Sequence, residues 1–89
     1  DSDKYNISIS GWVTDTDEQP IYDALIIIHN SDFSARSNET GFFMNTLRGV
    51  KMGEKIKVSV SHPYYKYASE DREIQKSKEE FHFTLTKIE

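Results

Sequence analysis

The sequence predicts an all-β fold, a seven-stranded two-sheet antiparallel sandwich, and three observations support this class. Apolar residues recur with a period of two along almost the whole chain, which is typical of strands with one buried face. Turn-forming residues interrupt these stretches at intervals of about 8–12 residues, as they do in small sandwiches. The 89 residues are too few for two independent cores, so residues 1–89 are predicted to form a single domain. Each sheet must then cover its apolar face with the other sheet.

The first two predicted strands lie before residue 30. Apolar and polar residues alternate from Tyr5 to Val13, and the polar, turn-rich residues 14–20 end this strand. The apolar run from Ala24 to Ile28 is too short for a typical helix and is rich in β-branched residues, which favours a second strand. Residues 30–34 are predicted to form the turn that closes it.

The middle of the chain predicts three further strands. Residues 35–38 form a brief third strand, and a turn at 39–41, in which Gly41 supplies a positive φ, leads to the fourth strand at 42–46. A loop between Gly49 and Gly53 precedes the fifth strand, in which Ile56, Val58 and Val60 face the core. The alternate positions of this strand, Ser59 among them, are predicted to lie on its outer face, and Pro63 stops the strand.

The last part of the chain contains one ambiguous stretch. Residues 68–80 include good helix formers, but Ile74 is their single large apolar residue, so a helix there would have no apolar stripe to dock. We therefore predict a charged loop with a short strand near Arg72 to Ile74. The seventh strand, from Phe81 to Leu85, follows from the alternation of apolar and polar residues.

The composition argues against several classes of function. The net charge of −4 and the absence of cysteine disfavour a nucleic-acid binder, a disulfide framework and a thiolate metal site. No apolar run approaches the ~20 residues needed to span a bilayer, so no membrane insertion by this segment is expected. Because the chain begins at Asp1, we expect a mature product or a segment of a longer protein. A basic patch is predicted to be a solvated strand edge; it consists of Arg48, Lys51, Lys55 and Lys57.

Four motifs resemble those of the carboxypeptidase regulatory-like domain family. They are Ile9-x-Gly11-x-Val13-x-Asp15, Pro20-Ile21-x-x-Ala24-x-Ile26-x-Ile28, Asn38-Glu39-Thr40-Gly41-Phe42-Phe43 and Val58-Ser59-Val60-Ser61-His62-Pro63-Tyr64-Tyr65. The resemblance covers about Ile7 to Leu85 and consists of structural residues. The chain departs from the family pattern at Asp23 and Tyr64, where the family usually has glycine.

The resemblance implies a transthyretin-like sandwich, a fold also grouped with carbohydrate-binding-like folds. Members of this family occur beside zinc carboxypeptidase domains, ahead of the plug of outer-membrane nutrient transporters, and in secreted or cell-surface proteins of bacteria. The resemblance therefore implies an accessory module in an extracytoplasmic location, whether periplasmic, cell-surface or secreted. Because this fold carries many functions, the location and role are inferred by analogy.

No catalytic residue and no metal ligand is predicted. His29, His62 and His82 fall near the ends or outer faces of three different strands and lack the short spacings of zinc ligands. Asp15, Asp17 and Glu18 share one turn, but the turn lacks the ligand pattern of a calcium loop. No serine is accompanied by a nucleophile motif or a general base. The chain is therefore expected to be non-enzymatic and to hold no cofactor.

Three apolar residues fall out of phase with the predicted core and are candidate partner-binding residues. When the in-phase residues point inward, Trp12 points outward from the first strand, and Leu25 and Ile27 point outward from the second. The resemblance places these two strands in different sheets, which gives two candidate surfaces. Tryptophan often dominates binding energy, so the Trp12 surface is favoured. The other explanation is that long loop side chains cover these positions.

Two aromatic residues suggest a competing site. Tyr64 and Tyr67 are predicted to lie in a loop at one end of the sandwich, where a sugar could stack on them. The main hypothesis is a non-enzymatic module that docks on a neighbouring domain of a larger polypeptide or on a protein partner. The alternative is a carbohydrate-binding module that uses Tyr64 and Tyr67. A third hypothesis is a small enzyme or metalloprotein built on the histidines.

Overall fold

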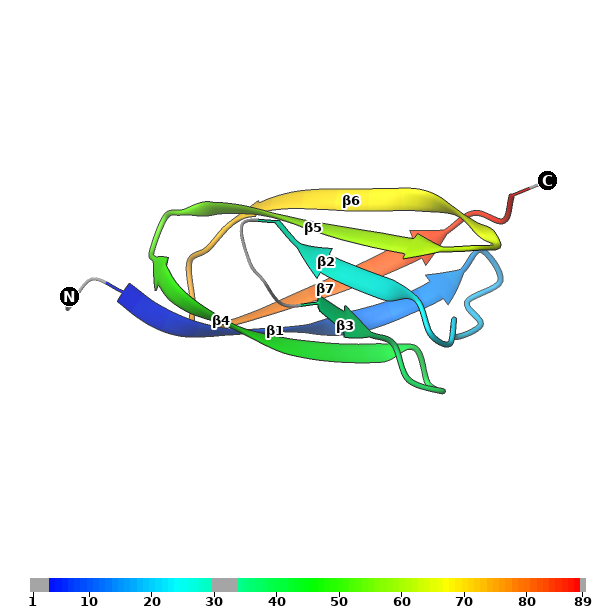
Figure 1. The fold of residues 1–89 in the computed structure, drawn as a ribbon, viewed down its shortest axis with the longest axis horizontal. Helices are drawn as coiled ribbons and strands as arrows, with labels where there is room; N and C mark the ends of the chain where they lie inside the picture. The colour runs from blue at the N-terminus through cyan, green and yellow to red at the C-terminus, as the bar shows by residue number, and fades with distance from the viewer. Residues whose placement is uncertain (1–3, 30–33, 89) are drawn as a thin grey trace.

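The structure is a computed structural model that describes residues 4–29 and 34–88. These residues form two packed sheets (Figure 1), and the predicted all-β sandwich is confirmed. One sheet has the strand order β4-β1-β7 and the other β3-β2-β5-β6. Neither described range contains a helix long and apolar enough to cross a membrane. The strands are β1 (Lys4–Asp15), β2 (Leu25–Ile28), β3 (Ser34–Arg36), β4 (Phe42–Lys51), β5 (Lys55–His62), β6 (Tyr65–Glu73) and β7 (Lys78–Leu85).

The sandwich is not entirely antiparallel, and this detail of the prediction is wrong. β1 pairs antiparallel with β4 but parallel with β7, from Ser8 opposite Lys78 to Asp15 opposite Leu85. The alternating direction of successive strands explains why β1 and β7 pair in parallel. When each strand reverses the direction of the strand before it, the first and seventh strands run the same way and can pair only in parallel. Figure 1 shows β1 and β7 pointing toward the same end of the molecule.

β6 is longer than the sequence predicts. A charged loop with a short strand near Arg72 to Ile74 is expected, whereas the structure has a strand over Tyr65–Glu73. The period of two is present, but the half-buried positions of this strand include Ala68 and Glu70 rather than large apolar residues. β6 is an edge strand of its sheet, and such strands tolerate polar residues on both faces. Apolar periodicity therefore could not reveal it.

Several strand boundaries also differ from the prediction. β3 covers Ser34–Arg36 rather than 35–38, and β4 continues to Lys51 rather than ending near residue 46. Gly49 lies within β4 with a φ of 71°. The predicted turn at 39–41 is confirmed, and Gly41 has a φ of 80° there. The turn predicted at residues 30–34 falls, apart from Ser34, outside the described residues.

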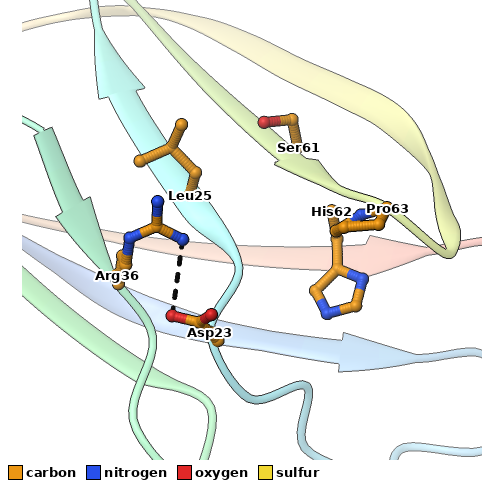
Figure 2. Close-up of a pocket in the computed structure, with 6 residues that line it drawn as sticks. All are labelled: Asp23, Leu25, Arg36, Ser61, His62 and Pro63. Atoms are coloured by element: carbon orange, nitrogen blue, oxygen red, sulfur yellow. Dashed lines mark hydrogen bonds and ion pairs between the residues drawn. The ribbon is translucent and has the colours of Figure 1, made fainter.

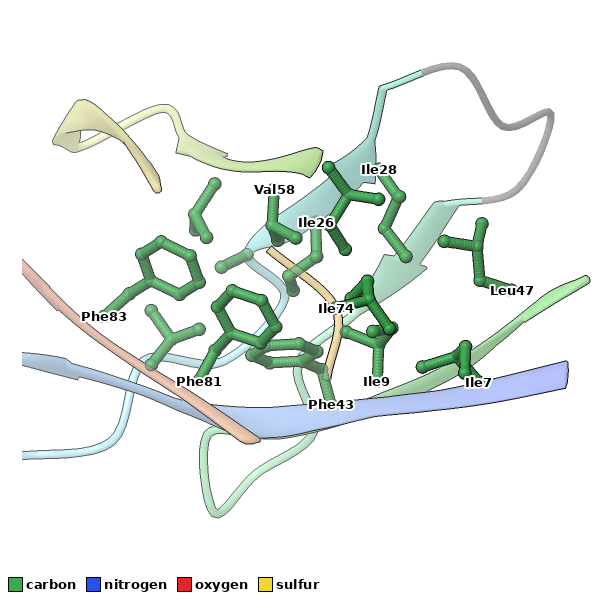
Figure 3. Packing of buried hydrophobic residues seen from close by; sticks show 14 of the residues in the cluster. Ile7, Ile9, Ile26, Ile28, Phe43, Leu47, Val58, Ile74, Phe81 and Phe83 are labelled. Carbon is green, nitrogen blue, oxygen red and sulfur yellow. The ribbon is translucent and has the colours of Figure 1, made fainter. Parts of the chain in front are cut away.

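The core lies between the two sheets and is filled by alternate residues of the strands. Figure 3 shows Ile9 and Phe43 of the three-stranded sheet facing Ile26 of the four-stranded sheet. The rings of Phe43 and Phe83 have their centroids 6.4 Å apart. Ile74, which follows β6, is fully buried in the same cluster. Most in-phase residues of the predicted strands lie in this core, but Tyr5 is 46% exposed, and the core also contains Ile21, Leu47 and Val50 from outside the predicted strands.

A polar cluster joins β6 to β7 across the side of the sandwich. Arg72 of β6 places Nη1 3.4 Å from Oε1 of Glu79, and its guanidinium lies 3.9 Å from the centre of the Phe81 ring. Glu79 Oε2 accepts the backbone N–H groups of Gln75 at 3.1 Å and Lys76 at 3.4 Å. Burial alone would raise the pKa of Glu79. The two N–H groups and Arg72 outweigh burial, so the pKa of Glu79 lies below its ordinary value of 4.5.

Candidate functional site

The outer face of the three-stranded sheet carries an exposed aromatic cluster. Trp12 lies in β1, the central strand, directly opposite Phe42 of β4, and the two rings meet edge to face with centroids 5.2 Å apart. Trp12 is 43% exposed, and Met44, two residues further along β4, is 62% exposed. We refer to Trp12, Phe42 and Met44 as the Trp12 face. Trp12 points outward, as the period of two predicts.

Phe42 and Met44 were missed at the level of sequence, although a signal for Phe42 is present. Consecutive side chains of a strand point to opposite faces, so only one residue of the pair Phe42-Phe43 can enter the core. Phe43 is the buried one, with 1% exposure. That Phe42 lies beside Trp12 depends on the register between β1 and β4, which the sequence does not show.

The third strand of this sheet borders the Trp12 face. His82 of β7 is the parallel partner of Trp12, and its Nε2 lies 3.0 Å from Oγ1 of Thr14. Thr14 is the next outward residue of β1 after Trp12. A hydrogen-bonded polar pair therefore lies next to the apolar cluster.

Leu25 and Ile27 lie on the opposite outer face, that of the four-stranded sheet. Ile27 is 39% exposed, whereas Leu25 is half-buried. β2 runs between β3 and β5, so Leu25 has Arg36 on one side and Ser61 on the other. The structure thus separates Trp12 from Leu25 and Ile27, and the three candidate partner-binding residues form two surfaces.

Ser59 lies on this outer face, as predicted, but it is buried there rather than exposed to solvent. Its exposed fraction is 3%. Nε2 of His29 lies 2.7 Å from Ser59 Oγ, and the Tyr67 hydroxyl donates a 2.7 Å hydrogen bond to the same oxygen. These two larger side chains come from either side of β5 and cover the serine. The alternation rule gave the correct face for Ser59 but could not show what lies over it.

A pocket lies on the same face, where β2 begins and β5 ends (Figure 2). Its volume is about 350 Å³. The strand register creates it, because three of its residues occupy one row across β3, β2 and β5. Of the pocket residues, only Leu25 was a candidate for partner binding at the level of sequence, and His62 entered only the metalloprotein hypothesis. The pocket is lined by Asp23, Leu25, Arg36, Ser61, His62 and Pro63.

Two pocket residues are held in defined local geometries. Asp23 has a φ of 63°, in the left-handed region that non-glycine residues seldom occupy, and its Oδ1 lies 3.4 Å from Nη1 of Arg36. Nδ1 of His62 accepts the backbone N–H of Tyr64 at 3.2 Å. In the neutral imidazole this bond assigns the proton to Nε2, so His62 can donate a hydrogen bond from that atom.

Tyr64 and Tyr67 do not share a loop, contrary to the prediction. Tyr64 lies in the turn between β5 and β6, is 69% exposed, and has its ring centroid 5.7 Å from that of His62. Tyr67 lies within β6 and is 62% exposed, and its hydroxyl bonds to Ser59. The longer β6 explains the difference, because it takes Tyr67 out of the turn and onto the face of the sheet.

The three histidines each have their own hydrogen-bond partner. His29 contacts Ser59, His62 accepts from Tyr64, and His82 contacts Thr14, as their ring nitrogens show. Within residues 4–29 and 34–88, no group of three or more His, Cys, Asp or Glu side chains is placed to hold a metal ion.

The four residues of the predicted basic patch are divided between the sheets. Arg48 and Lys51 belong to β4, whereas Lys55 and Lys57 belong to β5. The two β5 lysines lie opposite acidic residues of β6, an arrangement that favours cross-strand pairing. The register pairs are Lys55 with Glu73 and Lys57 with Asp71.

The fold defines this chain as a two-sheet β-sandwich. No family model matches the sequence, and no curated protein sequence matches it. Among solved structures, it is similar to 3-chlorocatechol 1,2-dioxygenase from Rhodococcus opacus 1CP, with a TM-score of 0.69 and 14% sequence identity. The match covers 94% of this chain and 60% of that one, so this chain spans less than two thirds of the dioxygenase chain. At this identity, the likeness shows the fold alone.

Proposed function

We propose that this chain is a non-enzymatic accessory module that docks through the Trp12 face on a neighbouring domain of a larger polypeptide or on a protein partner. The observation that carries the proposal is the exposure of Trp12 beside Met44 on the outer face of the sheet. Exposed apolar clusters commonly mark interaction surfaces, and tryptophan is among the residues that most often dominate their binding energy.

The position of Trp12 in the sheet also favours docking. β1 is hydrogen-bonded on both sides, by β4 and by β7, so the backbone of Trp12 is already fixed. The edge-to-face contact with Phe42 restrains the indole ring. A surface ordered before binding loses little conformational entropy when a partner docks. Ser10 and Thr14, the outward neighbours of Trp12 along β1, supply hydroxyl groups to a polar rim.

The non-enzymatic part of the proposal is supported by the setting of the hydroxyl groups. A nucleophile needs an adjacent base and access to substrate. Among the described residues, two hydroxyl groups contact an imidazole, and one of them, Ser59, is 3% exposed and covered by Tyr67. The other, Thr14, lies on the outer face of the three-stranded sheet, whereas the pocket described above belongs to the other sheet.

The same proposal places the chain in the carboxypeptidase regulatory-like family and outside the cytoplasm. It rests on the four sequence motifs and on the two-sheet sandwich, which is the architecture that the resemblance implies. The sequence motif that contains Gly41 adds support, because its glycine has the positive φ that such a turn requires.

Intrinsic fluorescence gives a direct test, because Trp12 is the one tryptophan in the sequence. The domain is titrated with the adjoining domain of its parent polypeptide. We expect a blue shift of the emission and protection from acrylamide quenching as the indole leaves water. Calorimetry should then show that Trp12→Ala abolishes binding, whereas Ile27→Ala, which truncates an exposed apolar side chain on the other sheet, retains it. If Ile27→Ala abolished binding and Trp12→Ala retained it, docking would take place on the four-stranded sheet, and the proposal would be wrong.

The carbohydrate alternative is tested with the same protein. It is supported by the exposed ring of Tyr64 in the turn after β5. A glycan panel is screened with the wild type, with Trp12→Ala and with a Tyr64→Ala, Tyr67→Ala double variant shown to be folded. Glycan binding that survives Trp12→Ala and is lost in the tyrosine variant would replace the docking proposal with the alternative.

A further inference from the structure

The pocket of the four-stranded sheet combines hydrogen-bond donors, one acceptor and apolar walls in a small volume. We infer that it binds the C-terminal end of a peptide whose last residue is apolar. The pocket lies on the sheet opposite the Trp12 face, so this inference does not depend on the docking proposal. Figure 2 shows Arg36, Leu25 and Asp23 on one side of the open space and His62 with Pro63 on the other.

Donors for a carboxylate come from three side chains on two strands, β3 and β5. Arg36 meets Asp23 through one nitrogen at 3.4 Å, and both side chains are more than half exposed, at 59% and 55%. Its planar guanidinium carries five N–H donors, so donors remain for an incoming carboxylate. Ser61 adds a hydroxyl in the same cross-strand row, and His62 adds the Nε2–H group that its bond to the Tyr64 amide assigns.

Asp23 distinguishes a peptide end from a simple anion. A simple carboxylate such as acetate would be repelled by Asp23 and would have no N–H or O–H donor to offer it. The last residue of a peptide carries a backbone N–H one Cα away from its carboxylate, so it can donate to Asp23 while its carboxylate meets Arg36. The net charge of −4 also argues that the chain does not collect anions nonspecifically.

The rest of the pocket suits an apolar side chain. Leu25 and Pro63 provide hydrocarbon surface between the polar groups. The volume of about 350 Å³ lies at the lower end of the range of ligand pockets, which is enough for one terminal residue but not for a large cofactor. The left-handed backbone of Asp23 supports a role in binding, since strained conformations of non-glycine residues concentrate at ligand sites.

The probe for this inference is N-acetyl-L-leucine, compared with N-acetyl-L-leucinamide, which lacks the carboxylate. We expect the acid to shift the backbone amide resonances of residues 23–25, 36, 61, 62 and 64 in nitrogen-15 spectra, and the leucinamide to shift them far less. Arg36→Gln should weaken binding of the acid about tenfold, as expected for loss of a charge-assisted hydrogen bond. Arg48→Gln removes the same charge from the other sheet and should leave the affinity unchanged.

A second variant tests the role of Asp23. Asp23→Gly deletes the carboxylate at a backbone conformation that glycine adopts readily, so the fold should be retained. It should weaken binding of N-acetyl-L-leucine but strengthen binding of 4-methylpentanoate, which has the same carboxylate and hydrocarbon without the N–H. Trp12→Ala should bind the acid like the wild type.

Three results would overturn the inference. They are equal shifts with the acid and the amide, resonance changes centred outside the pocket, and equal affinities of Arg36→Gln and Arg48→Gln. If 4-methylpentanoate bound more tightly than N-acetyl-L-leucine to the wild type, the pocket would be a site for free acyl carboxylates rather than peptide ends.

Discussion

Ser59 is a polar residue that is buried outside the main core. It lies on the outer face of the four-stranded sheet, under His29 and Tyr67, and both of these side chains contact its hydroxyl. The covering side chains themselves remain in contact with water, since Tyr67 is 62% exposed. Loss of the serine hydroxyl would therefore free two groups that can turn to solvent.

We predict that Ser59→Ala lowers the free energy of unfolding by about 1 kcal/mol, the usual net contribution of a hydrogen bond whose partners can be resolvated. Ser69→Ala provides the control, because Ser69 is the exposed partner of Ser59 on β6. The control should change stability by less than about 0.5 kcal/mol. Urea titrations that gave equal losses for the two variants would show that the contacts of Ser59 contribute nothing.

Gly41 and Gly49 share a positive φ but differ in their surroundings. Their φ values are 80° and 71°. A Cβ at Gly41 would lie 2.5 Å from the carbonyl oxygen of Val13, whereas a Cβ at Gly49 would meet no atom within 4 Å. We predict that Gly41→Ala costs more than about 1 kcal/mol and that Gly49→Ala costs less, since the second adds backbone strain alone. Denaturant titration measures both, and a larger loss for Gly49→Ala would contradict the close approach of Gly41 to the carbonyl oxygen of Val13.

At the scale of elements, the attachment of β6 to β7 depends on a charged group. The pKa of Glu79 is lowered below 4.5, although burial opposes this, because two backbone N–H groups and Arg72 favour the carboxylate. A carboxyl group that is more acidic in the folded chain stabilises the fold above its unfolded pKa. That contribution is lost as the pH falls from about 4.5 through the folded pKa of Glu79.

We therefore predict that the free energy of unfolding of the wild type falls as the pH is lowered below about 4.5. In Glu79→Gln, the free energy of unfolding should depend less steeply on pH in this range. At neutral pH, Glu79→Gln should be less stable than the wild type, because it weakens the contacts with Arg72 and the Gln75 amide. Glu80→Gln, at the exposed neighbouring position, is the matched control. Urea titrations at several pH values give the slopes, and identical slopes for Glu79→Gln and the wild type would exclude this role.

At the scale of the whole molecule, the interior and the outer faces should respond differently to truncation. Phe83 is 5% exposed and packs near Phe43, whereas Trp12 is 43% exposed. We predict that Phe83→Ala costs about 3–5 kcal/mol, as is typical for a buried phenylalanine. Trp12→Ala should cost much less despite removing a larger side chain. Comparable losses for the two variants would mean that Trp12 serves mainly to stabilise the fold.

The sequence by itself determined the all-β class, most of the strands and most of the residues that face the core. A period of two needs only local information, because successive side chains of a strand point to opposite faces. It was therefore sufficient to direct Ile9 inward and Trp12 outward. The same rule failed at β6, where the inward positions hold Ala68, Glu70 and Arg72 and no apolar contrast marks the strand.

Tertiary structure alone decided which outward residues meet. Sheet order and register join residues far apart in the chain, and both depend on the packing of the whole sandwich rather than on any local pattern. The register between β1 and β4 brings Phe42 to Trp12, and the rows across β3, β2 and β5 bring Arg36 to Leu25 and Ser61. The Trp12 face and the pocket arise from these pairings, which is why the sequence indicated single residues of each but neither surface as a whole.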